Sequence, residues 1–295
     1  MSKRGWLLFV AMSLIWGIPY LLIRVAVRSI DPGTLLVFRT IPAALMLLPI
    51  ALINRGFNSV KGRIRWVVMF AVAEFGIPWF FMGTAERHLT SSLTSLLASA
   101  VPLVTLGINA LMGREHGLSS TRLLGVGLGT AVVAGLVGFN VGHGSWKYIA
   151  MMAIVVLGYS VGPMILRYRL EGANGTAVVG ISALAMGAAW SPWALTHWPS
   201  HVSSEQWWSV AGLSGVCTAV AFVAFFALVH EVGPSRSVVV TFINPAVAVM
   251  IGVLGAHESL TTGIMLGLPL IVLGSVLATS SSGSAQSTVE ATRRR

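Results

Sequence analysis

The sequence predicts an all-α integral membrane protein with ten transmembrane helices in two inverted five-helix repeats. Three observations support this fold class. The 295-residue chain is 55% hydrophobic and only 9% charged, ten long apolar runs follow one another, and part of the first half recurs 143 residues later. Because soluble domains carry about 25% charged residues, the composition excludes an ordinary soluble protein.

The ten apolar runs each have about the 20 residues that a membrane-spanning helix needs. They lie at 5–24, 33–53, 66–85, 91–112, 122–140, 147–167, 175–196, 207–229, 236–255 and 262–279. Segments rich in Gly, Pro, Ser and charged residues separate them, as is typical of turns between helices. The last segment, 281–295, is polar and low in complexity, so we expect a disordered cytoplasmic tail there.

Basic residues are distributed unevenly between the two alternating sets of loops. If the N-terminus is cytoplasmic, the basic segments 61–65 and 293–295 fall inside, and the outside loops hold fewer Lys and Arg residues. The positive-inside rule therefore predicts that both termini are cytoplasmic. These loops account for the formal net charge of +10, so we do not expect nucleic acid as a partner.

An offset of 143 residues carries Pro102 onto Pro245 and Glu115 onto Glu258. In both copies the proline lies within a span and the glutamate follows thirteen residues later, where we expect a loop at the cytoplasmic face. Because each copy has an odd number of spans, the second would insert upside down, which is a transporter architecture. The predicted repeats are residues 1–143 and 144–280.

These segments resemble the EamA-type transporters of the drug/metabolite transporter superfamily over about residues 5–280. The resemblance lies in "LIWGIPYLLIRVAV", in "DPGTLLVFRTIPAALML", and in the pair that begins "SSLTSLLASAVPLV" and "PSRSVVVTFINPAV". It implies a ten-helix fold, export of small metabolites, and a central cavity bordered by the first and third helices. One departure is that the offset places Cys217 where the first half has Glu74.

Two charged residues lie inside predicted spans. Glu74 is close to the midplane, where a charge costs about 2.5–3.5 kcal/mol. It is a candidate proton-coupling or amine-binding carboxylate, and the alternative is a protonated structural acid that hydrogen-bonds a neighbouring helix. Arg39 could snorkel outward, pair with Glu74 or hold a substrate carboxylate, so both structural support and substrate contact stay open.

Aromatic and polar side chains within the spans are further candidates for a solute site. An aromatic wall suits an amphipathic or aromatic molecule. Ordinary helix packing is the alternative for each residue, and the resemblance favours the tryptophans of the first and third helices. The candidates are Trp16, Tyr20, Trp79, Tyr159 and Asn244.

Proline and glycine patterns indicate how the helices bend and pack. Pro102 and Pro245 each remove a helix hydrogen bond, so each is a candidate hinge, with a static kink as the alternative. The segments "GVGLG" at 125–129 and "GYSVG" at 158–162 have the small-residue spacing that lets helices approach closely.

Motifs for enzymatic chemistry are missing from the sequence. "HEVGP" and "HESLT" lack the second histidine of a zinc-protease motif, and no phosphate-binding loop motif occurs. The single cysteine, Cys217, excludes a structural disulfide within the chain, and we expect no metal or other cofactor.

We therefore predict a secondary transporter of the bacterial cytoplasmic membrane that exports small organic solutes, such as amino acids or aromatic metabolites, by alternating access. Proton coupling through Glu74 is a hypothesis. The alternatives are a proton-independent facilitator and a channel or lipid scramblase. The expected partners are the solute and the lipid bilayer, with protons and a second copy in a homodimer as further candidates.

Overall fold

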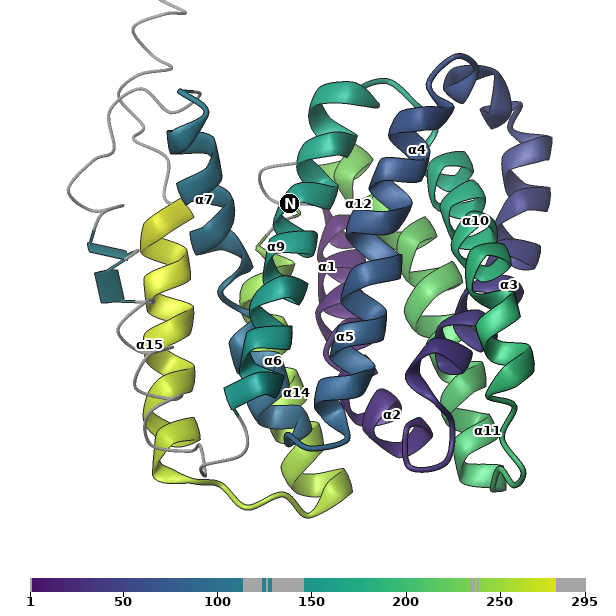
Figure 1. The fold of residues 1–295 in the computed structure, drawn as a ribbon. Helices are drawn as coiled ribbons and strands as arrows, with labels where there is room; N and C mark the ends of the chain where they lie inside the picture. Colours follow the sequence, from purple (N-terminus) through teal and green to yellow (C-terminus); the bar gives the residue numbers. More distant parts are fainter. Residues whose placement is uncertain are drawn as a thin grey trace, which may run out of the picture.

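The computed structural model describes residues 2–113, 124–125, 127–128, 146–233, 237 and 239–279. Every regular element in these ranges is helical (Figure 1). In chain order the elements are α1 (Lys3–Ile15), α2 (Pro19–Ala26), α3 (Pro32–Ile53), η1 (Gly56–Val60), α4 (Ile64–Ala71), η2 (Val72–Gly76), α5 (Ile77–Glu86), α6 (Ser91–Ala98), α7 (Val101–Leu111), α9 (Trp146–Arg169), α10 (Gly175–Thr196), α11 (Ser204–Ala211), η3 (Gly212–Val220), α12 (Ala221–Val232), α14 (Val240–Ala256) and α15 (Thr262–Thr279).

Consecutive elements join into apolar segments long enough to cross a membrane. Within the described ranges, seven such segments lie at Lys3–Ala26, Pro32–Ile53, Ile64–Glu86, Ser91–Leu111, Trp146–Arg169, Gly175–Thr196 and Ser204–Val232. Two shorter apolar helices, α14 and α15, follow them. These nine segments coincide with nine of the ten predicted runs. Most of the fifth run, 122–140, lies outside the described residues, as do Glu115 and the tail at 281–295.

The long segments run back and forth between two ends of the bundle. We call the end where α1 begins the near end and the opposite end, where α2 lies, the far end (Figure 1). Arg24 of α2 contacts Glu258, which follows α14, so Glu258 lies at the far end. The prediction that Glu258 shares the face of the N-terminus is therefore wrong, because α14 runs from the near end to the far end.

Side-chain caps fix where several helices begin. Asp31 accepts a hydrogen bond from the backbone N–H of Gly33 at 2.9 Å, and Asn174 accepts one from Ala177 at 2.9 Å. Ser203 and Gln206 form a reciprocal capping box at the start of α11. The first turn of a helix has N–H groups without partners in the helix, so a polar cap next to an apolar run stabilises the boundary.

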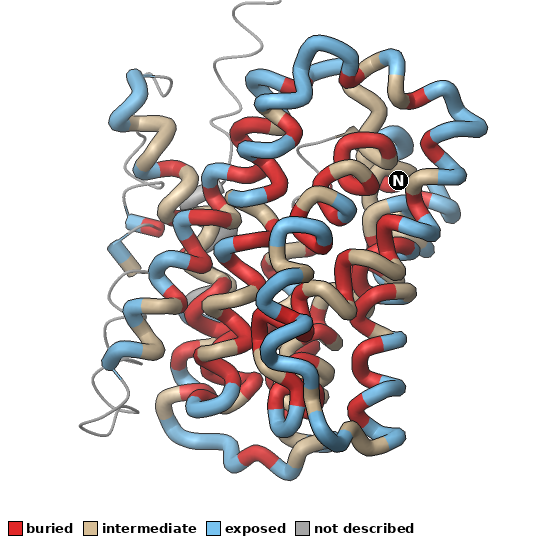
Figure 2. The backbone as a smooth tube through the Cα atoms, turned by 45° about the vertical axis from the view of Figure 1, so that its right-hand side comes forward, coloured by how far each residue is buried: buried red, intermediate tan, exposed pale blue. Residues whose placement is uncertain are grey.

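Buried residues concentrate where the helices face one another, and exposed residues lie on the outer surface of the bundle (Figure 2). Large apolar side chains occur in both positions. Helix α3 packs against α10 over most of its length, with Ala43, Ala44 and Leu47 fully buried. Leu45 and Leu52 of the same helix are exposed. Because α3 is apolar on all sides, its outer face fits contact with lipid rather than water.

Helix α9 comes very close to η2, as the spacing of "GYSVG" predicts. A Cβ atom added at Gly158 would lie 2.6 Å from the Ala73 carbonyl oxygen and 2.6 Å from Cγ of Pro78. One turn further along α9, a Cβ at Gly162 would overlap the Glu74 carboxyl group. Glycine at both positions therefore allows α9 to contact the backbone of the third span.

The close approach at Gly158 predicts that Gly158→Ala destabilises the protein by about 1–3 kcal/mol, because a rigid backbone oxygen must move. Gly107 lies in α7, and a Cβ there would meet no atom within 4 Å. Gly107→Ala should leave stability unchanged or raise it by up to about 1 kcal/mol, as for other exposed helix positions. Thermal unfolding of the two variants in detergent tests this difference, and equal midpoints would contradict it.

Candidate functional site

Four of the long segments depart from regular α-helix within the bundle. The first segment is interrupted at 16–18, between α1 and α2, and the fourth at 99–100, between α6 and α7. The third and eighth predicted spans each contain a π-helix, η2 and η3. The 143-residue offset carries 72–76 onto 215–219, which lies inside η3. Such π-helical turns occur frequently at functional sites.

An aromatic cluster connects the first, third and eighth spans. The Trp16 ring lies 4.8 Å from Phe225 and 6.0 Å from Phe222, measured between centroids. Phe222 continues the cluster to Phe75 at 5.7 Å, and Phe75 lies 4.7 Å from Trp79. Two of the predicted site residues, Trp16 and Trp79, are thus linked through Phe75 and Phe222. The interruption after α1 places Trp16 at this position.

Arg39 extends from α3 into the same region. Its side chain is buried, its Nε donates a hydrogen bond to Thr218 Oγ1 at 3.0 Å, and its guanidinium lies 3.5 Å from the centre of the Trp79 ring. Arg39 therefore does not snorkel outward. The ion pairs in the described part of the chain are Arg24 with Glu258 and Arg87 with Asp31, so Arg39 is not paired with Glu74 in this structure.

Glu74 lies on η2, across from Gly162 of α9. Its Oε2 atom is buried and has no hydrogen-bond partner. A buried carboxyl oxygen without a donor costs free energy if the group is charged. No hydrogen bond to a neighbouring helix is made through this oxygen, and the alternative of a protonated structural acid stays a prediction. Glu74 thus keeps an acceptor free inside the bundle.

Tyr159 lies between Arg39 and Glu74 in electrostatic terms, and Tyr20 lies near Arg39. Tyr159 of α9 lies within electrostatic range of Arg39, Tyr20 and Glu74. Arg39 in turn lies within range of Tyr20 and of Cys217 on η3. The structure therefore brings an acid, a base, two phenols and a tryptophan from α2, α3, η2, α5 and α9 into one region. This combination can contact a solute with both an apolar part and an ionisable group.

Asn244 lies on α14. Its Oδ1 atom is buried without a hydrogen-bond partner. Helix α14 packs against α1, and Gly17 in the interruption after α1 lies directly against Val247. Among the described residues, no ring contact or hydrogen bond links Asn244 to the aromatic cluster. Its place in a solute site stays a prediction.

The two prolines have different backbone surroundings. Pro102 lies at the start of α7, immediately after the interruption at 99–100, and the neighbouring Val101 carbonyl accepts a hydrogen bond from Ser160 of α9 at 3.2 Å. Pro245 lies inside the continuous helix α14. A hinge is therefore better supported at Pro102, where helical hydrogen bonding is already interrupted. The predicted hinge at Pro245 has no such interruption beside it.

Three residues at the far end were missed by sequence reasoning: Arg24, Glu86 and Glu258. The sequence predicts Glu258 at the opposite face, and Glu86 directly follows the third apolar run, outside the predicted span. The direction of α14 could have placed Glu258, since an odd number of predicted spans precedes it. No local pattern shows that Glu86 is buried, because the neighbouring Arg87 and His88 are typical of an exposed loop.

Comparison with known proteins assigns the chain to a family. The sequence profile described as the EamA-like transporter family matches residues 3–138 and 146–280. The chain is 26% identical to the uncharacterized inner membrane transporter YedA of Escherichia coli (strain K12), covering 91% of this chain and 88% of YedA. It is 22% identical to the uncharacterized transporter YvbV of Bacillus subtilis (strain 168), covering 95% of this chain and 93% of YvbV.

A solved structure has a similar fold. One crystal structure aligns with a TM-score of 0.69 over 95% of this chain and 97% of that chain. The two sequences are 19% identical in this alignment, so the similarity concerns the fold alone.

The contact between Arg39 and Thr218 predicts a specific loss of stability. Thr218→Val removes the acceptor of a buried guanidinium N–H, so we expect destabilisation by about 1–3 kcal/mol. Thr84→Val is the matched control, because the Thr84 hydroxyl bonds only the Phe80 carbonyl of its own helix. Thermal unfolding in detergent compares the two, and a loss at Thr218 no larger than at Thr84 would refute a stabilising role of this bond.

Proposed function

Because the chain belongs to the EamA-like transporter family, we propose that it is a secondary transporter that exports small organic solutes by alternating access. The solute binds among the first, second, third, sixth and eighth predicted spans, against the aromatic cluster and Arg39. Proton exchange at Glu74 drives its transport. The observation that carries this proposal is the buried Oε2 atom of Glu74, which has no hydrogen-bond partner, while Tyr159 lies within electrostatic range of both Glu74 and Arg39.

The proposed architecture has ten spans in two inverted halves, residues 1–143 and 144–280. Two findings support it: the family profile matches the chain twice, and η2 and η3 are related by the offset of the internal repeat. The name of YedA supports placement in a bacterial inner membrane. The near end, which is rich in arginine, would then face the cytoplasm, together with both termini.

The chemistry of the site favours an amphipathic or aromatic solute with an ionisable group. The rings of Trp16 and Phe222 offer apolar surface, and Arg39 offers hydrogen-bond donors for an anionic group. Glu74 offers an acceptor for a proton or an amine. A zwitterionic amino acid with a large side chain satisfies all three, so aromatic amino acids are the first solutes to test.

Alternating access needs places where helices can bend within the bundle. The interruptions at 16–18 and 99–100 border the site, and Ser160 of α9 holds the carbonyl of Val101 at the second of them. Movement at these points would open the site to one end and then to the other. A broken helix next to a site between the halves is an arrangement that secondary transporters use.

Glu74→Gln tests the coupling mechanism. Proteoliposomes of the wild type should accumulate a transported aromatic amino acid when a pH gradient is imposed, and the variant should lose this accumulation. Gln keeps the volume of the side chain but cannot exchange a proton, so exchange of labelled for unlabelled solute without a gradient should persist.

Glu171→Gln is the matched control, because Glu171 is an exposed acid at the near end, and this variant should transport normally. Gradient-driven accumulation in Glu74→Gln equal to that of the wild type would exclude Glu74 as the coupling group. Solute flux that does not saturate in either protein would favour a channel over a transporter.

The proposed topology predicts that residues of the near and far ends react from opposite sides. In intact cells, a membrane-impermeant maleimide should label Glu205→Cys, at an exposed position close to the start of α11, and should not label Ser2→Cys or Ser287→Cys. All three variants should react after the cells are permeabilised. Labelling of Ser287→Cys in intact cells would contradict an even number of spans with cytoplasmic termini.

A further inference from the structure

The far end of the bundle contains a second group of charged residues, separate from the proposed solute site. Glu258 is buried there and accepts five hydrogen bonds. They come from the backbone and hydroxyl of Ser91 at 2.8 and 2.7 Å, from the backbone of Ser92 at 3.0 Å, from the Ser92 hydroxyl, and from Arg24 Nη1 at 2.6 Å. These contacts join the segment after α14 to α2 and to the start of α6.

Burial alone would raise the pKa of Glu258, but the hydrogen bonds from Ser92 and Ser91 outweigh it and hold this pKa below its ordinary value. The carboxylate also lies at the N-terminal end of α6, where the helix dipole favours a negative charge. A lowered pKa means that Glu258 stays charged down to acidic pH, so its contacts are present throughout the neutral and alkaline range.

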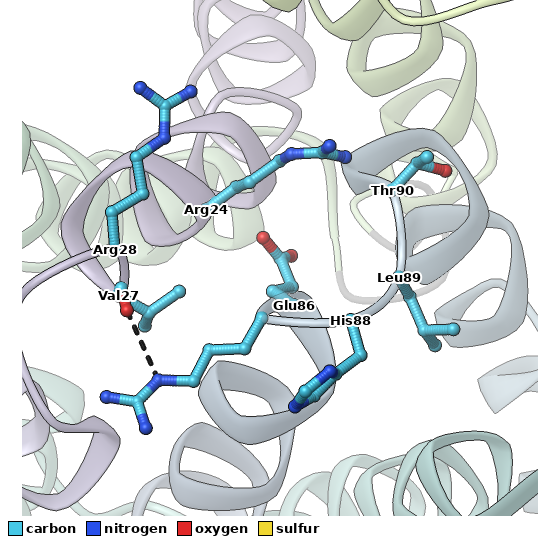
Figure 3. Close-up of a pocket in the computed structure, with 8 residues that line it drawn as sticks. Arg24, Val27, Arg28, Glu86, His88, Leu89 and Thr90 are labelled. Carbon is cyan, nitrogen blue, oxygen red and sulfur yellow. Dashed lines mark hydrogen bonds between the residues drawn. The ribbon is translucent and has the colours of Figure 1, made fainter. Parts of the chain in front are cut away.

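Glu86 has the opposite surroundings. Its side chain is only 2% exposed, and neither carboxyl oxygen has a hydrogen-bond partner. It is the last residue of α5, where the helix dipole disfavours a negative charge. Figure 3 shows its carboxyl group pointing toward the Arg24 side of a cavity of about 660 Å³. A charged carboxylate in this position would be buried without a side-chain donor, and burial and the nearby Glu258 outweigh the influence of Arg24, so this arrangement fits a proton on Glu86.

The charged side chains that line the cavity beside Glu86 form no ion pair with it in this structure, although the backbone of Arg24 lies close to its carboxyl group. Arg24 is bonded to Glu258, and Arg87 donates to the carbonyl oxygens of Val27 and Ile30 at 3.2 and 3.1 Å. Arg28 lines the same cavity and is exposed. Tyr20 of α2 also lies within electrostatic range of Glu86. Arg24 also lies within electrostatic range of Glu86, but its guanidinium forms its ion pair with the Glu258 carboxylate.

We propose that Glu86 is a proton-binding site at the far end, and that Arg24 moves from Glu258 to Glu86 when this end opens. In the closed arrangement Glu86 is protonated and Arg24 forms an ion pair with Glu258. On opening, the O–H bond of Glu86 breaks, the proton passes to water, and Arg24 pairs with the new carboxylate. Opening therefore releases one proton and becomes more favourable as the pH rises. This inference rests on the proposed alternating access.

Accessibility of a buried position in the cavity measures the opening directly. Val27 lines the cavity and is 3% exposed, so Val27→Cys should react with a water-soluble maleimide only when the far end opens. The native Cys217 is 1% exposed, and the parent protein sets the background. The purified protein in lipid nanodiscs would be labelled at several pH values from about 7 to about 9, where Glu258 remains charged.

Glu86→Gln, added to Val27→Cys, separates the proposed proton from the chemistry of the thiol. The same thiol reacts in both proteins, so its own ionisation cancels when the labelling rate with Glu86 present is divided by the rate in the Glu86→Gln variant. We expect this ratio to rise with pH by up to about tenfold per pH unit, which is the limit for one linked proton.

Two further variants test whether the position of Arg24 sets the pH at which labelling rises. Glu258→Gln releases Arg24 toward Glu86, so the rise in labelling should shift to lower pH. Glu205→Gln, an exposed acid near the same end, should leave the profile of the parent unchanged. His88 also lines the cavity, but burial, and then Lys147 and Arg87, lower its pKa, so it is neutral throughout this range.

Identical pH profiles with Glu86 and with Gln at this position would overturn the proposal, as would an absence of labelling at Val27→Cys in every variant, including Glu258→Gln. The assay measures no transport. It can therefore fail while Glu74-dependent, gradient-driven transport stands, and it can succeed if that transport is absent.

Discussion

The structure depends on one constraint, which is that every backbone N–H and C=O group inside a membrane must find its partner within the protein. The long apolar segments meet it by forming helices. Where the first segment is interrupted, the N–H groups of Trp16, Gly17 and Ile18 still donate to carbonyls of α1. Where the fourth is interrupted, Ser99 and Ala100 do the same with α6. The interruptions therefore bend the chain without leaving these donors without partners.

The same constraint explains why irregular backbone and polar side chains occur together. In η3 the Thr218 hydroxyl donates to the Leu213 carbonyl and accepts from Arg39, so one side chain satisfies both a helix carbonyl and a buried cation. In η2 the wider turn presents Glu74 to Gly162, where only glycine leaves room for the carboxyl group. Departures from α-helical geometry thus provide positions for polar groups that a regular apolar helix would not hold.

Three of the buried ionisable groups, Arg39, Glu74 and Glu86, have no ion-pair partner in the described part of the chain. Arg39 is stabilised by a hydroxyl and a ring, whereas the buried Oε2 atom of Glu74 keeps a free acceptor. At the far end, Arg24 is bonded to Glu258, and both carboxyl oxygens of Glu86 are left without a donor. Such groups are costly in a low-dielectric interior, and groups of this kind in membrane proteins usually serve transport or coupling.

The sequence by itself determined the helical membrane fold, the family and most of the candidate residues. Long apolar runs can be satisfied in lipid only as helices, and rare charges such as Glu74 and Arg39 stand out within them. The tertiary structure decided which side chains meet. It linked Trp16 to Trp79 through Phe75 and Phe222, paired Arg39 with Thr218 rather than Glu74, and buried Glu86 beside Arg24. These contacts join residues far apart in the chain, and they depend on how the helices tilt, break and face one another, which no local pattern encodes.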